Sequence, residues 1–292
     1  MKNFFAAYQR LAGFLSGFNL GKISSLKRLH EFLKAHLRPK FVKAQGYKFF
    51  IDRRDFTISS HLIENKIYEP IETELVKSQI NKGDIIIDIG ANIGYYTLIF
   101  AGLVGENGKV FAFEPDPDNF ALLNKNVKEN KFENVVLINK AVSDKNGKTK
   151  LYLSENNKGD HRIYDSGENR RSIMVDVVCL DDFLKDYKDK INFVKMDIQG
   201  AEGNALKGMA GIIKNNKKIK ILTEFWPMGL NNFYFDSRKF LGLLEDCGFS
   251  LYNILEAGAT RIIKDELLKK YPADRINHTN LFCIKEVSRF KI

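Results

Sequence analysis

The sequence predicts an α/β protein built on a doubly wound, mostly parallel sheet of seven strands. One observation is the apolar run at residues 84–89, which enters a glycine-containing turn at residues 90–94 and continues into a helix-like stretch at residues 95–103. A short apolar run that ends in glycines is typical of a buried strand that leads into a ligand-binding turn. A second observation is that strand-like and helix-like segments alternate through the rest of the chain, which is typical of a parallel sheet with crossover helices.

The other elements follow from the same patterns. Helices are expected at residues 71–80, where Pro70 occupies a tolerated first-turn position, and at residues 118–129 and 236–246, the last of which stops at Gly248. Residues 46–63 look extended, and the final strand is expected to be an antiparallel edge strand. The six strands that follow the first are expected at residues 109–113, 135–139, 192–196, 219–223, 249–254 and 281–285.

Two segments lie outside this alternation. An insert at about residues 145–180 contains a predicted β-hairpin, with strands at 149–153 and 173–178 around a long polar loop, and such loops are more often functional than idle. Residues 1–45 are predicted to be a basic, amphipathic, helical extension with helices at 1–20 and 24–37, so the main domain spans residues 46–292.

Composition limits the classes of function. Residues 1–50 contain ten Lys or Arg and one acid, a net charge of +9 out of +10 for the whole chain, so the core is nearly neutral and nucleic acid is not an expected partner. No run of eighteen apolar residues occurs, and three widely spaced cysteines favour a reducing compartment, so we expect a cytoplasmic protein. The basic residues 1–40 either pack on the domain or make peripheral contact with an anionic membrane.

Acidic residues stand at the ends of five predicted strands. Ligands of open α/β sheets bind beyond the carboxyl ends of the strands, so these acids mark a candidate site. Glu114 follows Asp88 by 26 residues, at the end of the next strand, where an acid can accept both hydroxyls of a ribose. The five acids are Asp88, Glu114, Asp144, Asp197 and Glu224.

The turn at residues 90–94 differs from a dinucleotide-binding loop. Its spacing is Gly90-x-Asn92-x-Gly94, without the central glycine of the pyrophosphate-binding pattern. The turn is therefore better suited to an uncharged or cationic adenosine derivative than to a pyrophosphate.

Several stretches resemble the FkbM family of class I S-adenosylmethionine-dependent methyltransferases, which have a Rossmann-like fold. The Asp-x-Gln-Gly-x-Glu stretch at residues 197–202 is the most family-specific of them, and the resemblance covers about residues 60–286. The stretches are residues 88–97, 113–117, 139–144, 195–202 and 222–226.

The resemblance implies S-adenosylmethionine as methyl donor and O-methylation of a hydroxyl on a sugar, a glycan or a small natural product. Open alternatives are an N-methyltransferase, and a membrane-docked or complex-forming module with a vestigial methyltransferase fold. The family pattern places the methionine part at residues 88–94, the ribose at Glu114 and the adenine at residues 141–144. The residues expected to bind the donor are Asp88, Gly90, Ala91, Asn92, Gly94, Tyr95, Glu114, Pro115, Ala141, Val142, Asp144 and Asp197.

An alcohol must lose its proton during methylation, so a base is expected near the methyl group. Asp197 is favoured by its place at a strand end, and His161 by its ordinary pKa. Whether a divalent metal takes part stays open; if it does, Asp197, Glu202 and Glu224 are its expected ligands. The candidate catalytic residues are Asp197, His161, Glu202 and Glu224.

Overall fold

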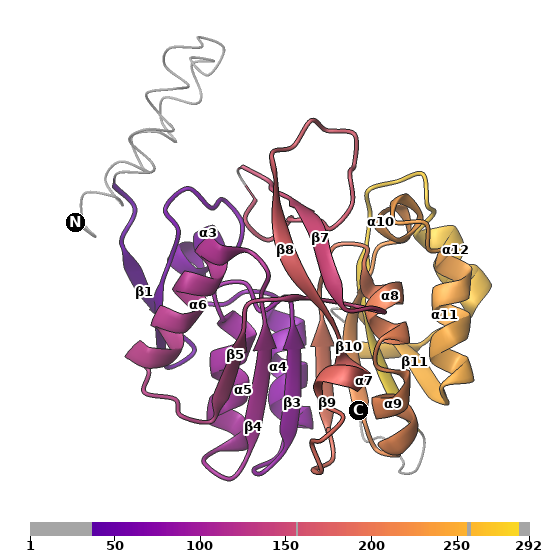
Figure 1. Ribbon diagram of the computed structural model, residues 1–292, viewed down its shortest axis with the longest axis horizontal. Coiled ribbons are helices and arrows are strands. Elements are labelled where there is room, and N and C mark those ends of the chain that lie inside the picture. Colours follow the sequence, from indigo (N-terminus) through magenta and orange to yellow (C-terminus); the bar gives the residue numbers. More distant parts are fainter. Residues whose placement is uncertain (1–36, 156, 256–257, 286–292) are drawn as a thin grey trace.

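The central sheet has eight strands in the order β12-β11-β13-β10-β9-β3-β4-β5 in the computed structural model, which describes residues 37–155, 157–255 and 258–285 (Figure 1). The five strands from β10 to β5 run parallel, and β13 is antiparallel to both β10 and β11. The strands are β3 Ile85–Ile89, β4 Lys109–Phe113, β5 Val135–Ile138, β9 Phe193–Met196, β10 Lys220–Phe225, β11 Phe249–Leu255, β12 Gly258–Arg261 and β13 Thr279–Lys285.

The predicted fold class is confirmed, with two differences at one edge of the sheet. The seven expected strands are present, and β12 adds an eighth as the antiparallel partner of β11. The last strand is antiparallel as expected, but the prediction that it lies at the edge is wrong, because β13 is inserted between β10 and β11.

Two apolar cores cover the two faces of the sheet. The alternation of side chains along β3 sends Ile85, Ile87 and Ile89 into one core and Ile86 into the other. Asp88 shares the face of Ile86, which decides the side on which its carboxylate lies. Side chains of α4 Pro70–Gln79, α5 Tyr95–Val104 and α6 Pro117–Glu129 join the core of Ile86, and those of α7 Leu180–Phe183, α8 Glu202–Lys207, α9 Ala210–Asn215, α11 Ser237–Asp246 and α12 Lys264–Lys270 join the other.

A β-hairpin precedes the main sheet. Strands β1 Phe41–Ala44 and β2 Tyr47–Phe50 pair with each other, and Asn126 of α6 accepts the Phe50 N–H at 2.6 Å. The expected extended segment is correct for β2 and wrong for α3 Ile58–Glu64, which is helical. The expected boundary between residues 45 and 46 falls in the turn of this hairpin.

The helices expected at residues 1–20 and over most of 24–37 lie outside the described residues, so membrane contact through this segment stays a prediction. In the described part of the chain, no helix combines the length and the apolar character needed to span a membrane.

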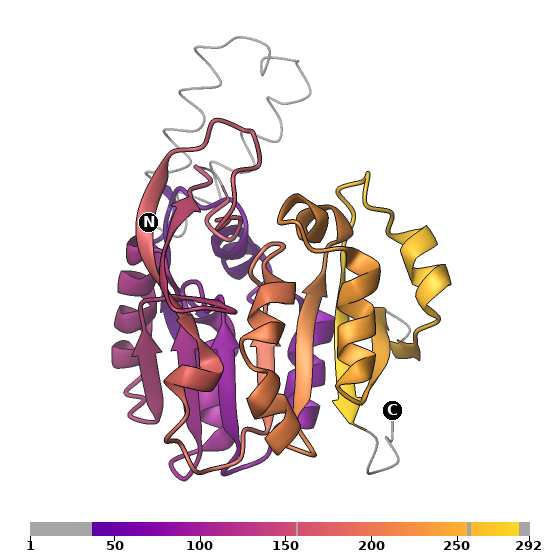
Figure 2. The same ribbon diagram turned by 45° about the vertical axis from the view of Figure 1, so that its right-hand side comes forward.

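The insert forms a small sheet of its own above the carboxyl ends of the main strands (Figures 1 and 2). The expected hairpin is present as the antiparallel pair β7 Gly147–Tyr152 and β8 Ser172–Cys179. A third strand, β6 Ala141–Ser143, pairs in parallel with β8, so the chain leaves the main sheet after Ile138. The loop between β7 and β8 is thereby carried back over the ends of β3 and β4.

Candidate active site at the carboxyl ends of the parallel strands

The turn after β3 is built from three residues in the left-handed region. Gly90, Asn92 and Gly94 have φ angles of 81°, 51° and 91°. A Cβ atom on Gly90 would lie 2.1 Å from the carbonyl oxygen of Asp197, so only glycine fits there. Asn92 tolerates this backbone conformation, and its Oδ1 accepts the N–H of Ile93 at 2.7 Å. The turn therefore needs no central glycine, and it lies directly against the end of β9.

Glu114 is held rigidly at the end of β4. Its carboxylate accepts the backbone N–H of Asn92 at 2.8 Å and that of Asp116 at 2.9 Å, and the residue is only 5% exposed. Burial raises the pKa of Glu114 to about 8, although the two N–H contacts act in the opposite direction. A buried carboxyl group of this kind is prepared to receive hydrogen-bond donors from a ligand.

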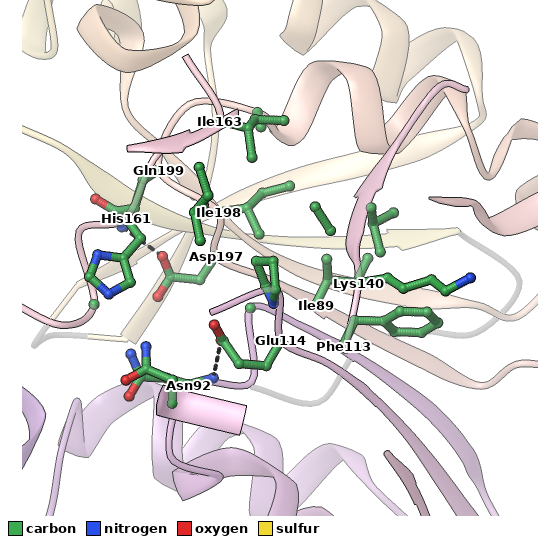
Figure 3. A pocket seen from close by; sticks show the side chains of 18 of the residues that line it. Ile89, Asn92, Phe113, Glu114, Lys140, His161, Ile163, Asp197, Ile198 and Gln199 are labelled. Atoms are coloured by element: carbon green, nitrogen blue, oxygen red, sulfur yellow. Dashed lines mark hydrogen bonds between the residues drawn. The ribbon is translucent and has the colours of Figure 1, made fainter. Parts of the chain in front are cut away.

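Two neighbouring cavities open above these strand ends. The first cavity lies between the turn, the end of β4 and the insert, and Figure 3 shows Glu114 at its floor with His161 and Asp197 above it. Of the residues expected to form a site, those that line the first cavity are Gly90, Asn92, Glu114, Pro115, Ala141, Val142, His161 and Asp197.

The second cavity lies on the face of the sheet that carries α4 and α5. Gly90, Asn92, Gly159, Asp197 and Gln199 line both cavities, so the two adjoin along these residues. Of the residues expected to form a site, those that line the second cavity are Asp88, Gly90, Ala91, Asn92, Tyr95, Asp197 and Glu224.

Three expected site residues line neither cavity. Gly94 faces Leu123 of α6, and Asp144 is exposed beyond the end of β6, because the chain turns into the insert before reaching it. Glu202 is fully buried, and its carboxylate accepts the N–H groups of Ile198 at 3.0 Å and Gly200 at 2.9 Å. Glu202 therefore fixes the backbone conformation of the loop after β9 through these two hydrogen bonds.

Asp88 and Lys195 are buried neighbours under the second cavity, and burial raises the pKa of Asp88. They are register partners on β3 and β9, and both are almost fully buried. Asp88 accepts the Thr97 hydroxyl at 2.6 Å through Oδ2, while Oδ1 has no hydrogen-bond partner in the described part of the chain. Burial lowers the pKa of Lys195, but the carboxylates of Asp197, Glu69 and Asp88 outweigh it, so the net shift is upward and the ammonium stays charged.

Asp197 stands where the two cavities meet. Gln199 donates from Nε2 to its Oδ1 at 2.8 Å, and Lys195 Nζ lies 3.5 Å from its Oδ2. Gln199 also donates to Glu224 at 3.2 Å, so one side chain links the acids at the ends of β9 and β10. The positive φ angle of Gln199, 56°, is part of the tight turn that presents the Asp197 carboxylate.

Several residues of the second cavity were missed by sequence reasoning. Glu69 has a left-handed backbone (φ 44°) although it precedes a proline, and its carboxylate accepts the Tyr96 hydroxyl at 2.8 Å. Burial raises the pKa of Glu69 to about 7. Tyr68 and His278 complete this wall. The sequence signal that could have indicated a charged wall here is Lys195, a lysine inside an otherwise apolar strand.

The described residues contain no group of three or more His, Cys, Asp or Glu side chains placed to hold a metal ion. The three carboxylates expected as ligands do not converge, since Glu202 is occupied with backbone N–H groups while Asp197 and Glu224 face the second cavity.

The insert carries arginines that also stay outside both cavities. Arg162 and Arg170 both form ion pairs with Asp160 and Glu168. The guanidinium group of Arg162 also lies 4.9 Å from the ring centre of Trp226. These arginines stabilise the fold of the insert.

Comparison with known proteins places this chain in a family. The family model of the methyltransferase FkbM domain matches residues 88–251, and that of protein-L-isoaspartate(D-aspartate) O-methyltransferase matches residues 21–145. Hexuronic acid methyltransferase AglP of Haloferax volcanii is 27% identical over 143 residues, which cover 48% of this chain and 56% of that protein. Methyltransferase sdnD of Sordaria araneosa is 25% identical over 238 residues, with 68% of this chain and 87% of that protein covered.

A crystal structure of methyltransferase FkbM from Methylobacillus flagellatus is 20% identical, with a TM-score of 0.42, and the match covers 70% of this chain and 44% of that one. The chain thus spans about half the length of AglP and of this crystallised protein. The FkbM match covers more than half of the present chain and includes the turn after β3, the end of β4 and the loop after β9. The chain therefore belongs to the methyltransferase FkbM domain family.

Proposed function

We propose that the chain transfers the methyl group of S-adenosylmethionine to a hydroxyl group of a sugar, a glycan or a small natural product. The observation that carries this proposal is the position of Asp197, whose carboxylate borders both cavities at the end of β9. Methylation of a hydroxyl is assisted by a proton acceptor beside the reacting oxygen, and Asp197 would serve as that acceptor if donor and acceptor meet where the two cavities adjoin.

The residues of the first cavity fit the nucleoside part of the donor. Glu114 would accept the two ribose hydroxyls, and Ala141 and Val142 would contact the adenine. Asp88 would receive the ammonium of the methionine part, because its Oδ1 is buried and without a partner among the described residues. Buried acceptors without partners are costly unless a ligand or water satisfies them.

The donor supplies a methyl group on a positively charged sulfur, and the protein has to align the acceptor oxygen with it. Alignment of this kind can account for much of the rate of a displacement reaction. Asp197 would take the proton of the acceptor hydroxyl, while Lys195 and Gln199 hold its carboxylate in one orientation.

The second cavity supports a hydroxyl-bearing acceptor. Its wall combines Tyr68, Glu69, Glu224 and His278, which offer hydrogen-bond donors and acceptors beside aromatic surface. Such walls suit polyhydroxylated molecules, whose hydroxyls both donate and accept. One relative is a hexuronic acid methyltransferase, which is in keeping with a sugar acceptor.

The proposal is tested with S-adenosylmethionine that carries a labelled methyl group and with carbohydrate fractions from cells that make this protein. We expect label in a product that survives mild alkali, since methyl ethers are stable there and methyl esters are not. Label that appears only on amines would favour an N-methyltransferase instead. If calorimetry detects no binding of either the donor or S-adenosylhomocysteine, the methyltransferase activity itself is refuted.

The role of Asp197 is tested by Asp197→Asn, which should retain affinity for the donor and lose most turnover. Asp144→Asn is the matched control, because Asp144 is exposed and lines neither cavity. Turnover of Asp197→Asn equal to that of the control would remove Asp197 from the mechanism.

A further inference from the structure

We infer that the insert is part of the donor site, and that His161 donates a hydrogen bond from Nε2 to the nucleoside part of the bound donor. This inference rests on the proposed use of S-adenosylmethionine and is independent of the acceptor. It assigns to the insert a binding role beside that of the core residues of the first cavity.

The loop that carries His161 is fastened across the first cavity. Residues 157–161, here called the strap, are held through the carbonyl oxygen of Lys158, which accepts Asn92 Nδ2 and Asn119 Nδ2, each at 2.9 Å. Asn92 belongs to the turn after β3 and Asn119 to α6, so the strap is attached to both sides of the nucleoside end of the site.

A second attachment comes from the segment before α3. The Thr57 hydroxyl contacts Asn157 Oδ1 at 2.6 Å, and Asp55 accepts the Lys158 N–H at 3.3 Å. The strap backbone beside the first cavity is therefore held by three side chains, and a fourth, that of Thr57, holds the Asn157 side chain. His161, at the end of the strap, lines this cavity and not the second one.

The hydrogen bond made by one ring nitrogen decides the protonation of the other. The backbone N–H of Ser154 donates to His161 Nδ1 at 3.0 Å, so Nδ1 presents its lone pair and the proton of the neutral ring lies on Nε2. Burial lowers the pKa of His161, which favours this neutral form. Within the described residues Nε2 has no hydrogen-bond acceptor.

This arrangement gives His161 a role different from the catalytic base that its ordinary pKa suggests. A base needs a free lone pair, and the lone pair of His161 is already used by Ser154. The Nε2–H group is a donor, and the oxygens and ring nitrogens of a nucleoside are acceptors. Figure 3 shows His161 on the strap side of the cavity and Glu114 on the strand side, so the two residues offer a donor and an acceptor to the same ligand.

The test measures the binding of S-adenosylhomocysteine to the full chain by calorimetry, together with thermal unfolding. In His161→Asn, the side-chain oxygen replaces Nδ1 and keeps the Ser154 contact, but the side chain does not reach the position of Nε2. In His161→Gln, the longer amide places an N–H group near that position. His61→Asn is the matched control, since His61 is an exposed histidine outside both cavities.

We expect His161→Asn to weaken binding by about threefold to tenfold with unchanged thermal stability, as for one lost neutral hydrogen bond. His161→Gln should recover most of that loss, and His61→Asn should bind like the unmodified chain. Nitrogen NMR of the imidazole should show the Nε2–H form and a shift of its proton when the ligand binds.

Equal affinities of the unmodified chain and His161→Asn would overturn the inference. A loss shared by both His161 variants and accompanied by lower thermal stability would also overturn it, because it would indicate a structural role alone. If the unmodified chain does not bind S-adenosylhomocysteine, the proposed donor fails, and this inference fails with it.

Discussion

Binding of the donor should release a proton from Glu114, and the amount can be worked out from its environment. Burial raises the pKa of this carboxyl group to about 8, so about nine-tenths of it is protonated at pH 7 in the free chain. Two ribose hydroxyls, added to the N–H groups of Asn92 and Asp116, would give the carboxylate four hydrogen-bond donors. Because such contacts favour the charged form, the bound carboxyl group should ionise.

The expected release is about 0.9 proton per S-adenosylhomocysteine at pH 7 and about 0.1 at pH 9, where the free carboxyl group is already ionised. Calorimetry in two buffers with different ionisation enthalpies gives the number directly. The perturbation is Glu114→Gln, which removes the titrating group and should cut the release at pH 7 by about 0.9 proton.

The same substitution should weaken binding by about tenfold to a hundredfold, because a hydrogen bond to a charged group is replaced by one to a neutral amide. The reasoning is refuted if the unmodified chain and Glu114→Gln release the same number of protons at pH 7. A release by the unmodified chain that does not fall between pH 7 and pH 9 would refute it independently of the variant.

Three further predictions concern the framework of the site. Gly90→Ala should lower the free energy of unfolding by about 3 kcal/mol and abolish binding of S-adenosylhomocysteine, because the new Cβ would lie 2.1 Å from the Asp197 carbonyl oxygen. Urea denaturation and calorimetry measure the two effects, and a variant that binds normally would contradict the prediction. Glu202→Ala should cost about 2–4 kcal/mol in the same denaturation assay, since the buried N–H group of Gly200 and the partly buried N–H group of Ile198 lose their acceptor. A cost below about 0.5 kcal/mol would contradict the role of Glu202. The free chain should melt at a higher temperature at pH 6 than at pH 8.5. The folded state keeps protons on Glu69 and Glu202 (pKa about 7) and on Glu114 (pKa about 8) that the unfolded state loses near pH 4.5, so the stability that these protons confer disappears as the pH rises through 7 to 8. A melting temperature that rises over this range would be inconsistent with those pKa values.

Much of the fold was predictable because its main signals are local. Most strands of the main sheet are short apolar runs bounded by polar turns, and that pattern located the seven principal strands. Strand β12 was missed because Gly258–Arg261 is short and partly polar, and it is defined only by its pairing with β11. Helix α3 was missed because it is only seven residues long, so Ile58 and Leu62 provide a single apolar i, i+4 pair and no longer periodic pattern.

The candidate site was predictable in so far as it lies at strand ends. Asp88, Glu114, Asp197 and Glu224 each follow a strand or stand near its end, and the topology brings them to one edge of the sheet. Asp144 was placed in the site because β5 and β6 look like one strand in the sequence, whereas the chain changes sheets between them.

The rest of the second cavity depends on long-range packing. Glu69 comes from the segment before β3, the first parallel strand, and His278 from the segment before β13, the antiparallel last strand, and they meet only after the sheet has formed. Nothing in the local sequence of either residue indicates this meeting.

The contact between Gly90 and Asp197 has a consequence for altering the specificity of this protein. In the turn after β3, Gly90 approaches the backbone carbonyl of Asp197, the proposed base, with no side chain between them. Their spacing is therefore fixed by the main chain and cannot be adjusted by exchanging a side chain. The far wall of the second cavity is different, because Glu69 and His278 are carried by segments outside the parallel strands. Under the proposed function, substitutions at that wall would alter acceptor preference while the register between methyl donor and base stays constant.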